Sequence, residues 1–310
     1  MIIIAVLYFL FAITFILAKS VLYYISPLLL IGIRMTLAGT VLLGYLAIRK
    51  KISIFRKSWP LLVQLIFFHI YLAYGAEFWA LQFTSSTKTA LIYNMSPFIT
   101  ALMVAFLGYE RVSRTQWIGL GVGFCALVPW ALSTTGCEDI FGSLLSLSIP
   151  ELVLLIAVTS SAYGWILVGR LIREYRYAPA LVNGIAMFFG GLLALMSSYL
   201  IEGATGFIGL RTLCSTVHYQ PLLSSDLVIA GGYLAGLIII ANLICYNLYG
   251  YLLHRYSATL LSFAGSLCPL FTGILEWLIR GEPLTGYFYA TLLLTTVGLY
   301  IFYRNELGHQ

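Results

Sequence analysis

Two ionisable side chains, Glu77 and Lys88, stand in the stretch from Tyr74 to Pro97, between apolar runs long enough to cross a lipid bilayer. An ionised side chain at the centre of a membrane helix costs on the order of 2.5–3.5 kcal/mol, so it normally faces a partner or a water-filled cavity. A carboxylate among aromatic rings suits a cation, because it supplies the countercharge while the ring faces attract the cation as well. We therefore predict a substrate site around Glu77. The alternative is that Glu77 only pairs with Lys88 or Arg34.

Other polar and aromatic residues are candidates for the wall of this site. Tyr74 lies one helical turn before Glu77 on the same face, and Asn94 and Ser266 lie one turn before the prolines of their helices. The candidate substrate-binding residues are Glu77, Tyr74, Trp79, Lys88, Tyr93, Asn94, Tyr163, Trp165 and Ser266. Pro97 and Pro269 each remove a helix hydrogen bond, so we expect them to bend their helices near the site.

Three of the ionisable residues have simpler interpretations. Lys88 has a stem long enough to carry its ammonium to the membrane interface. Arg34 fits a structural clamp on helix ends better than a ligand contact, and His69 fits a hydrogen-bonded polar group better than a proton relay. We expect no metal and no cofactor, because the sequence has no metal-ligand spacing and no phosphate-binding loop.

The composition sets the class of protein that must hold these residues. Of the 310 residues, 61% are hydrophobic and only 9% are charged, against about 25% charged in soluble domains. The sequence therefore predicts an all-α polytopic membrane protein. The net charge of +6 does not indicate nucleic-acid binding, because the basic residues lie in short loops, where membrane proteins place them on the cytoplasmic side.

Ten apolar runs are long enough to be transmembrane helices. They span approximately 2–20, 27–48, 59–83, 86–108, 115–134, 149–170, 178–201, 226–251, 257–280 and 284–303. Placing the loops near Lys50, Arg114 and Arg173 inside collects twelve of the basic residues in the cytoplasm. We therefore predict an inner-membrane protein with both termini cytoplasmic.

The chain also repeats itself. SPLLLIGIRMTLAG (26–39) matches APALVNGIAMFFGG (178–191), and Pro97 and Glu110 match Pro269 and Glu282. Each half holds five helices, an odd number, so the two copies must be inverted relative to each other. We predict repeats at 1–135 and 149–304. Inverted repeats are typical of secondary transporters, which bind their substrate between the repeats near the midplane.

The five cysteines show no Cys-x-x-Cys motif. Cys137 and Cys214 both fall in loops predicted to be external, where an oxidising compartment would allow a disulfide.

On these features the chain resembles the EamA-type members of the drug/metabolite transporter superfamily. The resemblance rests on Arg34, on the small and hydroxyl residues that lead to Pro97 and Pro269, and on GYERVSRTQWIGLGVGFCALV (108–128). It implies a carrier of a small molecule that works by alternating access without ATP. The intramembrane enzyme is a weaker alternative, since no catalytic motif is present.

Within the superfamily, EFWALQFTSSTKTALIYNMSPF (77–98) is similar to the branch that carries S-adenosylmethionine and S-adenosylhomocysteine in intracellular bacteria. This similarity implies uptake of S-adenosylmethionine in exchange for S-adenosylhomocysteine. Glu77 would then recognise the cationic part of the substrate, and the nearby aromatic rings would hold the base. Exporters of aromatic amino acids and of lipophilic cationic drugs remain as alternatives.

Overall fold

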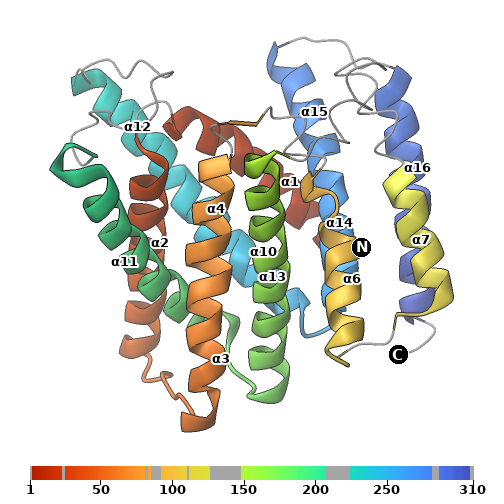
Figure 1. Ribbon diagram of the computed structural model, residues 1–310, viewed down its shortest axis with the longest axis horizontal. Coiled ribbons are helices and arrows are strands. Elements are labelled where there is room, and N and C mark those ends of the chain that lie inside the picture. The colour runs from red at the N-terminus through yellow and green to blue at the C-terminus, as the bar shows by residue number, and fades with distance from the viewer. Residues whose placement is uncertain are drawn as a thin grey trace.

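The computed structural model describes residues 2–22, 25–80, 83–84, 92–109, 112–125, 148–206, 224–280 and 286–307. Within these ranges every regular element is helical (Figure 1). Six helical stretches are long and apolar enough to cross a membrane, which confirms the predicted all-α polytopic class. They are Pro27–Ile48, Arg56–Ala80, Ile149–Glu174, Pro179–Ile201, Val228–Leu252 and Ala258–Leu275.

The first half of the chain contributes α1 (Ile2–Leu22), α2 (Pro27–Ile48), a continuous stretch of four elements, α6 (Ser96–Phe106) and α7 (Arg114–Cys125). The continuous stretch consists of the 3₁₀ turn η1 (Arg56–Ser58), α3 (Trp59–Gln64), the π-helix η2 (Leu65–Leu72) and α4 (Ala73–Ala80). Prolines stand at the starts of α2, α3 and α6, where the missing N–H has no helical partner to lose.

The second half follows a similar order. It contains α10 (Ile149–Glu174), α11 (Pro179–Gly206), a stretch with a second π-helix, another stretch with a 3₁₀ turn, and α16 (Gly286–Leu307). The first stretch is α12 (Ser224–Leu237), η3 (Ile238–Cys245) and α13 (Tyr246–Leu252); the second is α14 (Ala258–Ala264), η4 (Gly265–Leu267) and α15 (Cys268–Arg280). Pro97 and Pro269, the predicted helix-bending residues, lie in the first turns of α6 and α15.

The helices α2 and α11 pack at backbone distance, and their contacts are reciprocal. A Cβ on Gly39 would overlap the backbone of Phe188, while a Cβ on Gly191 would lie 2.6 Å from the backbone N of Thr36. The two contacts are equivalent at a spacing of 152 positions, which relates Thr36 to Phe188 and Gly39 to Gly191. Small residues allow membrane helices to approach this closely.

The same reciprocity holds further along these helices. A Cβ on Gly32 would meet the Leu195 side chain at 2.6 Å, and one on Gly184 would meet the Leu43 side chain at 3.2 Å. Again 43 to 195 and 32 to 184 are each 152 positions apart. Similar surfaces that are related by a two-fold arrangement produce reciprocal contacts of this kind, in which two residues meet and their equivalents in the other helix meet in the same way.

The basic loops gather at one end of the bundle. The turns that join α2 to α3, α6 to α7 and α10 to α11 all lie toward the lower end in Figure 1, as does the C-terminus. Lys50, Lys51 and Arg176 belong to these turns. Membrane proteins concentrate basic residues in this way on their cytoplasmic side.

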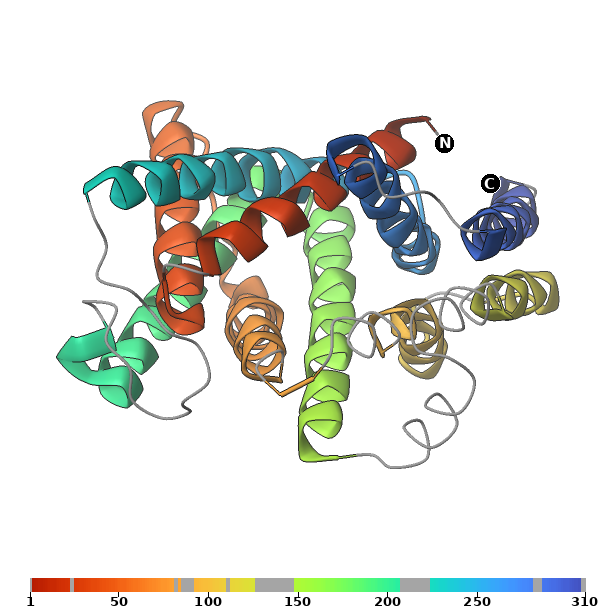
Figure 2. The ribbon, with the colours of Figure 1, turned by 90° about the horizontal axis from the view of Figure 1, so that it is seen from above.

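From above, α10 crosses the middle of the bundle (Figure 2). It packs against α4 and η2 on one side and against α6, α13 and α14 on others, so its side chains reach both halves of the chain. At one edge of the bundle α7 packs against α16.

Candidate functional site

The two π-helices precede a contact between two tyrosines. Tyr74 follows η2 in α4, Tyr246 follows η3 at the start of α13, and their hydroxyls are hydrogen-bonded to each other. The two residues are 172 positions apart, the same spacing that relates Pro97 to Pro269. The π-helices begin at equivalent places to within one residue, at 65 and 238. π-Helical turns inside α-helices are rare and occur frequently at functional sites.

Aromatic rings surround this tyrosine pair. Trp165 of α10 stacks on Tyr249, with ring centroids 3.8 Å apart and an interplanar angle of 24°. The same indole lies 5.0 Å from the Tyr246 ring and 4.5 Å from His69. His69 belongs to η2, so three separate helical stretches meet at these rings. We call Tyr74, His69, Trp165, Tyr246 and Tyr249 the aromatic cluster.

A buried cation faces the aromatic cluster from α2. The Arg34 side chain is only 5% exposed, and its Cζ lies 4.7 Å from the Tyr74 ring centroid and 5.9 Å from that of Phe78. A desolvated cation over a ring gains roughly 2 kcal/mol, too little to replace the hydration that a guanidinium loses on burial. Further partners are therefore expected close to Arg34.

The Glu77 carboxylate, one turn beyond Tyr74, interacts with this cation. Glu77 is partly buried and interacts electrostatically with Arg34 and with Tyr74. Between these two described residues no direct ion pair is formed. Tyr93 lies beside Glu77, and its buried hydroxyl has no hydrogen-bond partner of normal geometry among the described residues.

Arg34 Nε and Asn242 Oδ1 are buried here and have no hydrogen-bond partner within the described part of the chain. The buried Tyr93 hydroxyl and His69 ring face the Glu77 carboxylate and the Ser161 backbone, without a hydrogen bond of normal geometry there. The amide nitrogen of Asn242 donates to two weak acceptors, Met35 Sδ at 2.9 Å and Met187 Sδ at 3.9 Å. Each unsatisfied buried group costs about 1–3 kcal/mol, so groups of this kind normally take their hydrogen bonds from water or a ligand. The arrangement is suited to binding a polar, charged small molecule.

The structure brings together four of the residues predicted from the sequence: Tyr74, Glu77, Tyr93 and Trp165. Trp79 does not join them, because it is 41% exposed and packs against Phe83 instead. Tyr163 points elsewhere as well, since its hydroxyl donates to Gln64 Oε1 at 2.5 Å and its ring packs edge-on against Phe68.

The remaining predicted residues lie along the neighbouring helices. Asn94 is buried just before α6, and Ser266 donates to the backbone O of Phe263 at 2.7 Å within the 3₁₀ turn η4. Pro97 is buried, and of Pro269 the structure describes the backbone. Lys88 lies outside the described residues, as do Cys137 and Cys214.

Sequence reasoning did not place Tyr246 and Tyr249 in the site, although a signal for both existed. They are the partners of Tyr74 and Glu77 at the 172-residue spacing. His69 was expected to be a hydrogen-bonded polar group, and its contact with the backbone of Ser161 agrees with this, although neither ring nitrogen reaches normal hydrogen-bond geometry in the described structure. No group of three or more metal-ligand side chains occurs within the described ranges.

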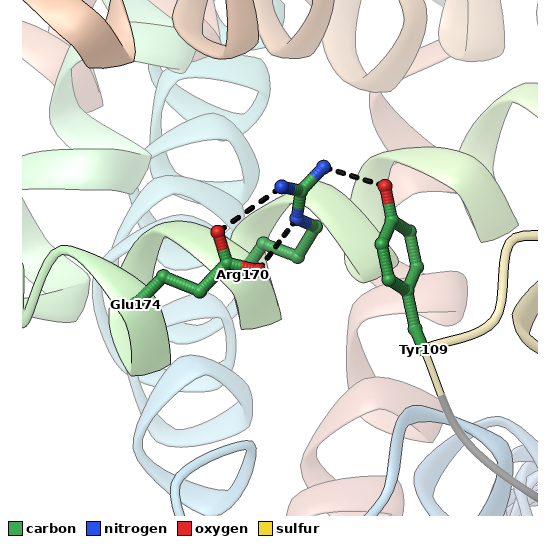
Figure 3. Close-up of polar contacts among 3 residues, drawn as sticks. All are labelled: Tyr109, Arg170 and Glu174. Atoms are coloured by element: carbon green, nitrogen blue, oxygen red, sulfur yellow. Dashed lines mark hydrogen bonds and ion pairs between the residues drawn. The ribbon is translucent and has the colours of Figure 1, made fainter.

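The C-terminal end of α10 is tied to both halves of the chain. Arg170 donates from Nε and Nη2 to the two carboxylate oxygens of Glu174, at 2.8 and 3.0 Å, and from Nη1 to the Tyr109 hydroxyl at 2.5 Å (Figure 3). Arg173 donates to the backbone O of Leu253 at 2.7 Å and of Tyr256 at 2.6 Å. These bonds anchor the helix that carries Trp165.

Comparison with known proteins agrees with this architecture. The family model of the EamA-like transporter family matches residues 1–129 and 148–304. The chain therefore belongs to the EamA-like transporter family and is a membrane transporter rather than an enzyme.

Its relatives include carriers of known names. It is 32% identical, over 96% of its length and 89% of the relative's, to the S-adenosylmethionine/S-adenosylhomocysteine transporter of Chlamydia muridarum. It is 25% identical, over 93% of its length and 89% of the relative's, to a probable amino-acid metabolite efflux pump of Salmonella typhimurium. A solved crystal structure shares the fold, with a TM-score of 0.72, 18% identity and coverage of 99% of this chain and 97% of that one.

Proposed function

We propose that the protein exchanges S-adenosylmethionine for S-adenosylhomocysteine, importing the former by alternating access. The observation that carries this proposal is 32% identity, over 96% of the chain, to a transporter of that name. The candidate site supports it. Arg34 and Glu77 supply opposite charges, and the aromatic cluster supplies rings on which adenine would stack and a sulfonium would be attracted.

The proposed topology is ten transmembrane helices in two inverted repeats, 1–135 and 149–304, in the inner membrane with both termini cytoplasmic. The reciprocal contacts of α2 with α11 support the repeats, as does the hydrogen bond between Tyr74 and Tyr246. The basic turns at one end of the bundle support the orientation. In such carriers the repeats rock about a site between them.

Amino-acid export is the second candidate, because the Salmonella typhimurium relative is named a probable amino-acid metabolite efflux pump. A broad exporter of lipophilic cations is the third transport alternative, since one carboxylate among aromatic rings would also suit such compounds.

A competition assay separates the three. Uptake of labelled S-adenosylmethionine into proteoliposomes is measured with a tenfold excess of unlabelled S-adenosylhomocysteine, phenylalanine or tetraphenylphosphonium. We expect S-adenosylhomocysteine to inhibit uptake by more than half and the other two to leave it nearly unchanged. Inhibition by tetraphenylphosphonium alone would favour the drug exporter. Export of labelled phenylalanine, together with no uptake of S-adenosylmethionine, would favour the amino-acid exporter.

A further inference from the structure

Arg34 is a buried cation with one hydrogen-bond donor, Nε, that the described protein does not satisfy. Its side chain is 5% exposed, and its Nε has no partner among the described residues. Its described contacts run to the rings of Tyr74 and Phe78 and to the Tyr74 hydroxyl, and they leave the Nε donor without an acceptor. A guanidinium presents a planar fork of N–H groups that matches a carboxylate. A residue that merely clamped helix ends would place this fork on backbone carbonyls, as Arg173 does on Leu253 and Tyr256.

Glu77 lies one helical turn beyond Tyr74 on the same helix face. The two charges influence each other electrostatically, yet these two described side chains form no direct ion pair. Two buried side chains of opposite charge that do not pair with each other suit a ligand that carries a negative group and a positive group close together. The α-amino acid group is such a ligand, because its carboxylate and its ammonium are attached to one carbon.

We propose that Arg34 binds the carboxylate, and Glu77 the ammonium, of the α-amino acid end of the substrate; this inference rests on the function proposed above. S-adenosylmethionine and S-adenosylhomocysteine share that end and differ in the charge on sulfur. Arg34 and Glu77 would bind the α-amino acid end that both substrates share, while the aromatic cluster would lie beside the sulfur, where the substrates differ. One site would thus accept both exchange partners.

The test compares ligands with and without the carboxylate. Inhibition constants against labelled S-adenosylmethionine are measured in proteoliposomes for S-adenosylmethionine and for its decarboxylated form, which keeps the ammonium, sulfonium and adenosine. The proteins are the wild type, Arg34→Gln, Arg34→Lys and Lys51→Gln. The last is a matched control, because it removes one positive charge from an exposed position far from the site in sequence.

The wild type is expected to prefer S-adenosylmethionine over the decarboxylated form by at least tenfold. In Arg34→Gln this preference should fall below about threefold, through weaker binding of S-adenosylmethionine only. Arg34→Lys should retain part of the preference, since it keeps the charge and loses the fork. Lys51→Gln should match the wild type.

Two results would overturn the inference. One is a wild type that binds both ligands alike, which settles the question even if Arg34→Gln does not fold. The other is an Arg34→Gln protein that weakens both ligands equally, which would make Arg34 a structural clamp. If the proposed function is wrong, the result is different: the wild type takes up no S-adenosylmethionine. That result would also contradict the inference, because the inference rests on the proposed function.

Discussion

Replacing Glu77 by glutamine is expected to lower S-adenosylmethionine uptake at least tenfold while leaving the folded protein in the membrane. Hydrogen bonds to charged groups contribute about 1.5–3 kcal/mol, and 1.4 kcal/mol corresponds to a tenfold change in binding. Glutamine has nearly the same shape and keeps the hydrogen-bonding oxygen, so the change removes the charge from the site and little else. The measurement is the initial rate of uptake per correctly inserted transporter.

The chain offers a matched control for this substitution. Glu174→Gln removes the same charge from a side chain that is 46% exposed and pairs with Arg170 at the end of α10. Exposed ion pairs contribute about 0–1 kcal/mol, so uptake by this variant should stay within about twofold of the wild type. Unchanged transport by Glu77→Gln would show that Glu77 is not part of the substrate site.

A valine at Gly39 is expected to destabilise the whole bundle. Even a single Cβ at this position would overlap the backbone of Phe188, and backbone atoms cannot swing away as a side-chain end can. Overpacking a core typically costs 1–3 kcal/mol, and this contact joins the two helices with the most extensive packing in the described structure. We expect most of the monodisperse protein to be lost on size-exclusion chromatography, or a melting temperature several degrees lower.

Gly44 provides the control on the same helix. A Cβ at Gly44 would meet nothing within 4 Å, so Gly44→Val adds the same side chain without a clash. Its melting temperature should lie within about 2 °C of the wild type. Equal melting temperatures for the two variants would mean that α2 and α11 do not pack as closely as described.

The helices were predictable because apolar runs indicate where a chain crosses the membrane and basic loops indicate where it turns. The apolar runs at 27–48 and 149–170 became α2 (Pro27–Ile48) and α10 (Ile149–Glu174). The two π-helices were not predictable, since η2 and η3 contain no glycine or proline to mark them. The reciprocal glycine contacts lie where the sequence repeats most clearly, at 26–39 and 178–191.

The site could be predicted only in part, because its residues come from helices whose rotation the sequence leaves open. Successive helix residues turn by about 100°, so Trp79 lies about 140° around from Tyr74 and Tyr163 about 200° from Trp165. The two members of each pair therefore cannot both face one cavity. The position of Arg34 beside Tyr74 depends on how α2 packs against α4, which no local pattern determines.

The measurement that tests the proposed exchange most directly is uptake of labelled S-adenosylmethionine into proteoliposomes with S-adenosylhomocysteine loaded inside. The empty carrier of an exchanger reorients slowly across the membrane. Internal S-adenosylhomocysteine should therefore raise the initial rate of S-adenosylmethionine uptake at least severalfold over vesicles loaded with buffer. External S-adenosylhomocysteine should inhibit the same uptake. Uptake that proceeds at one rate with and without internal S-adenosylhomocysteine would contradict the exchange mechanism, and no uptake by correctly inserted protein would contradict the substrate as well.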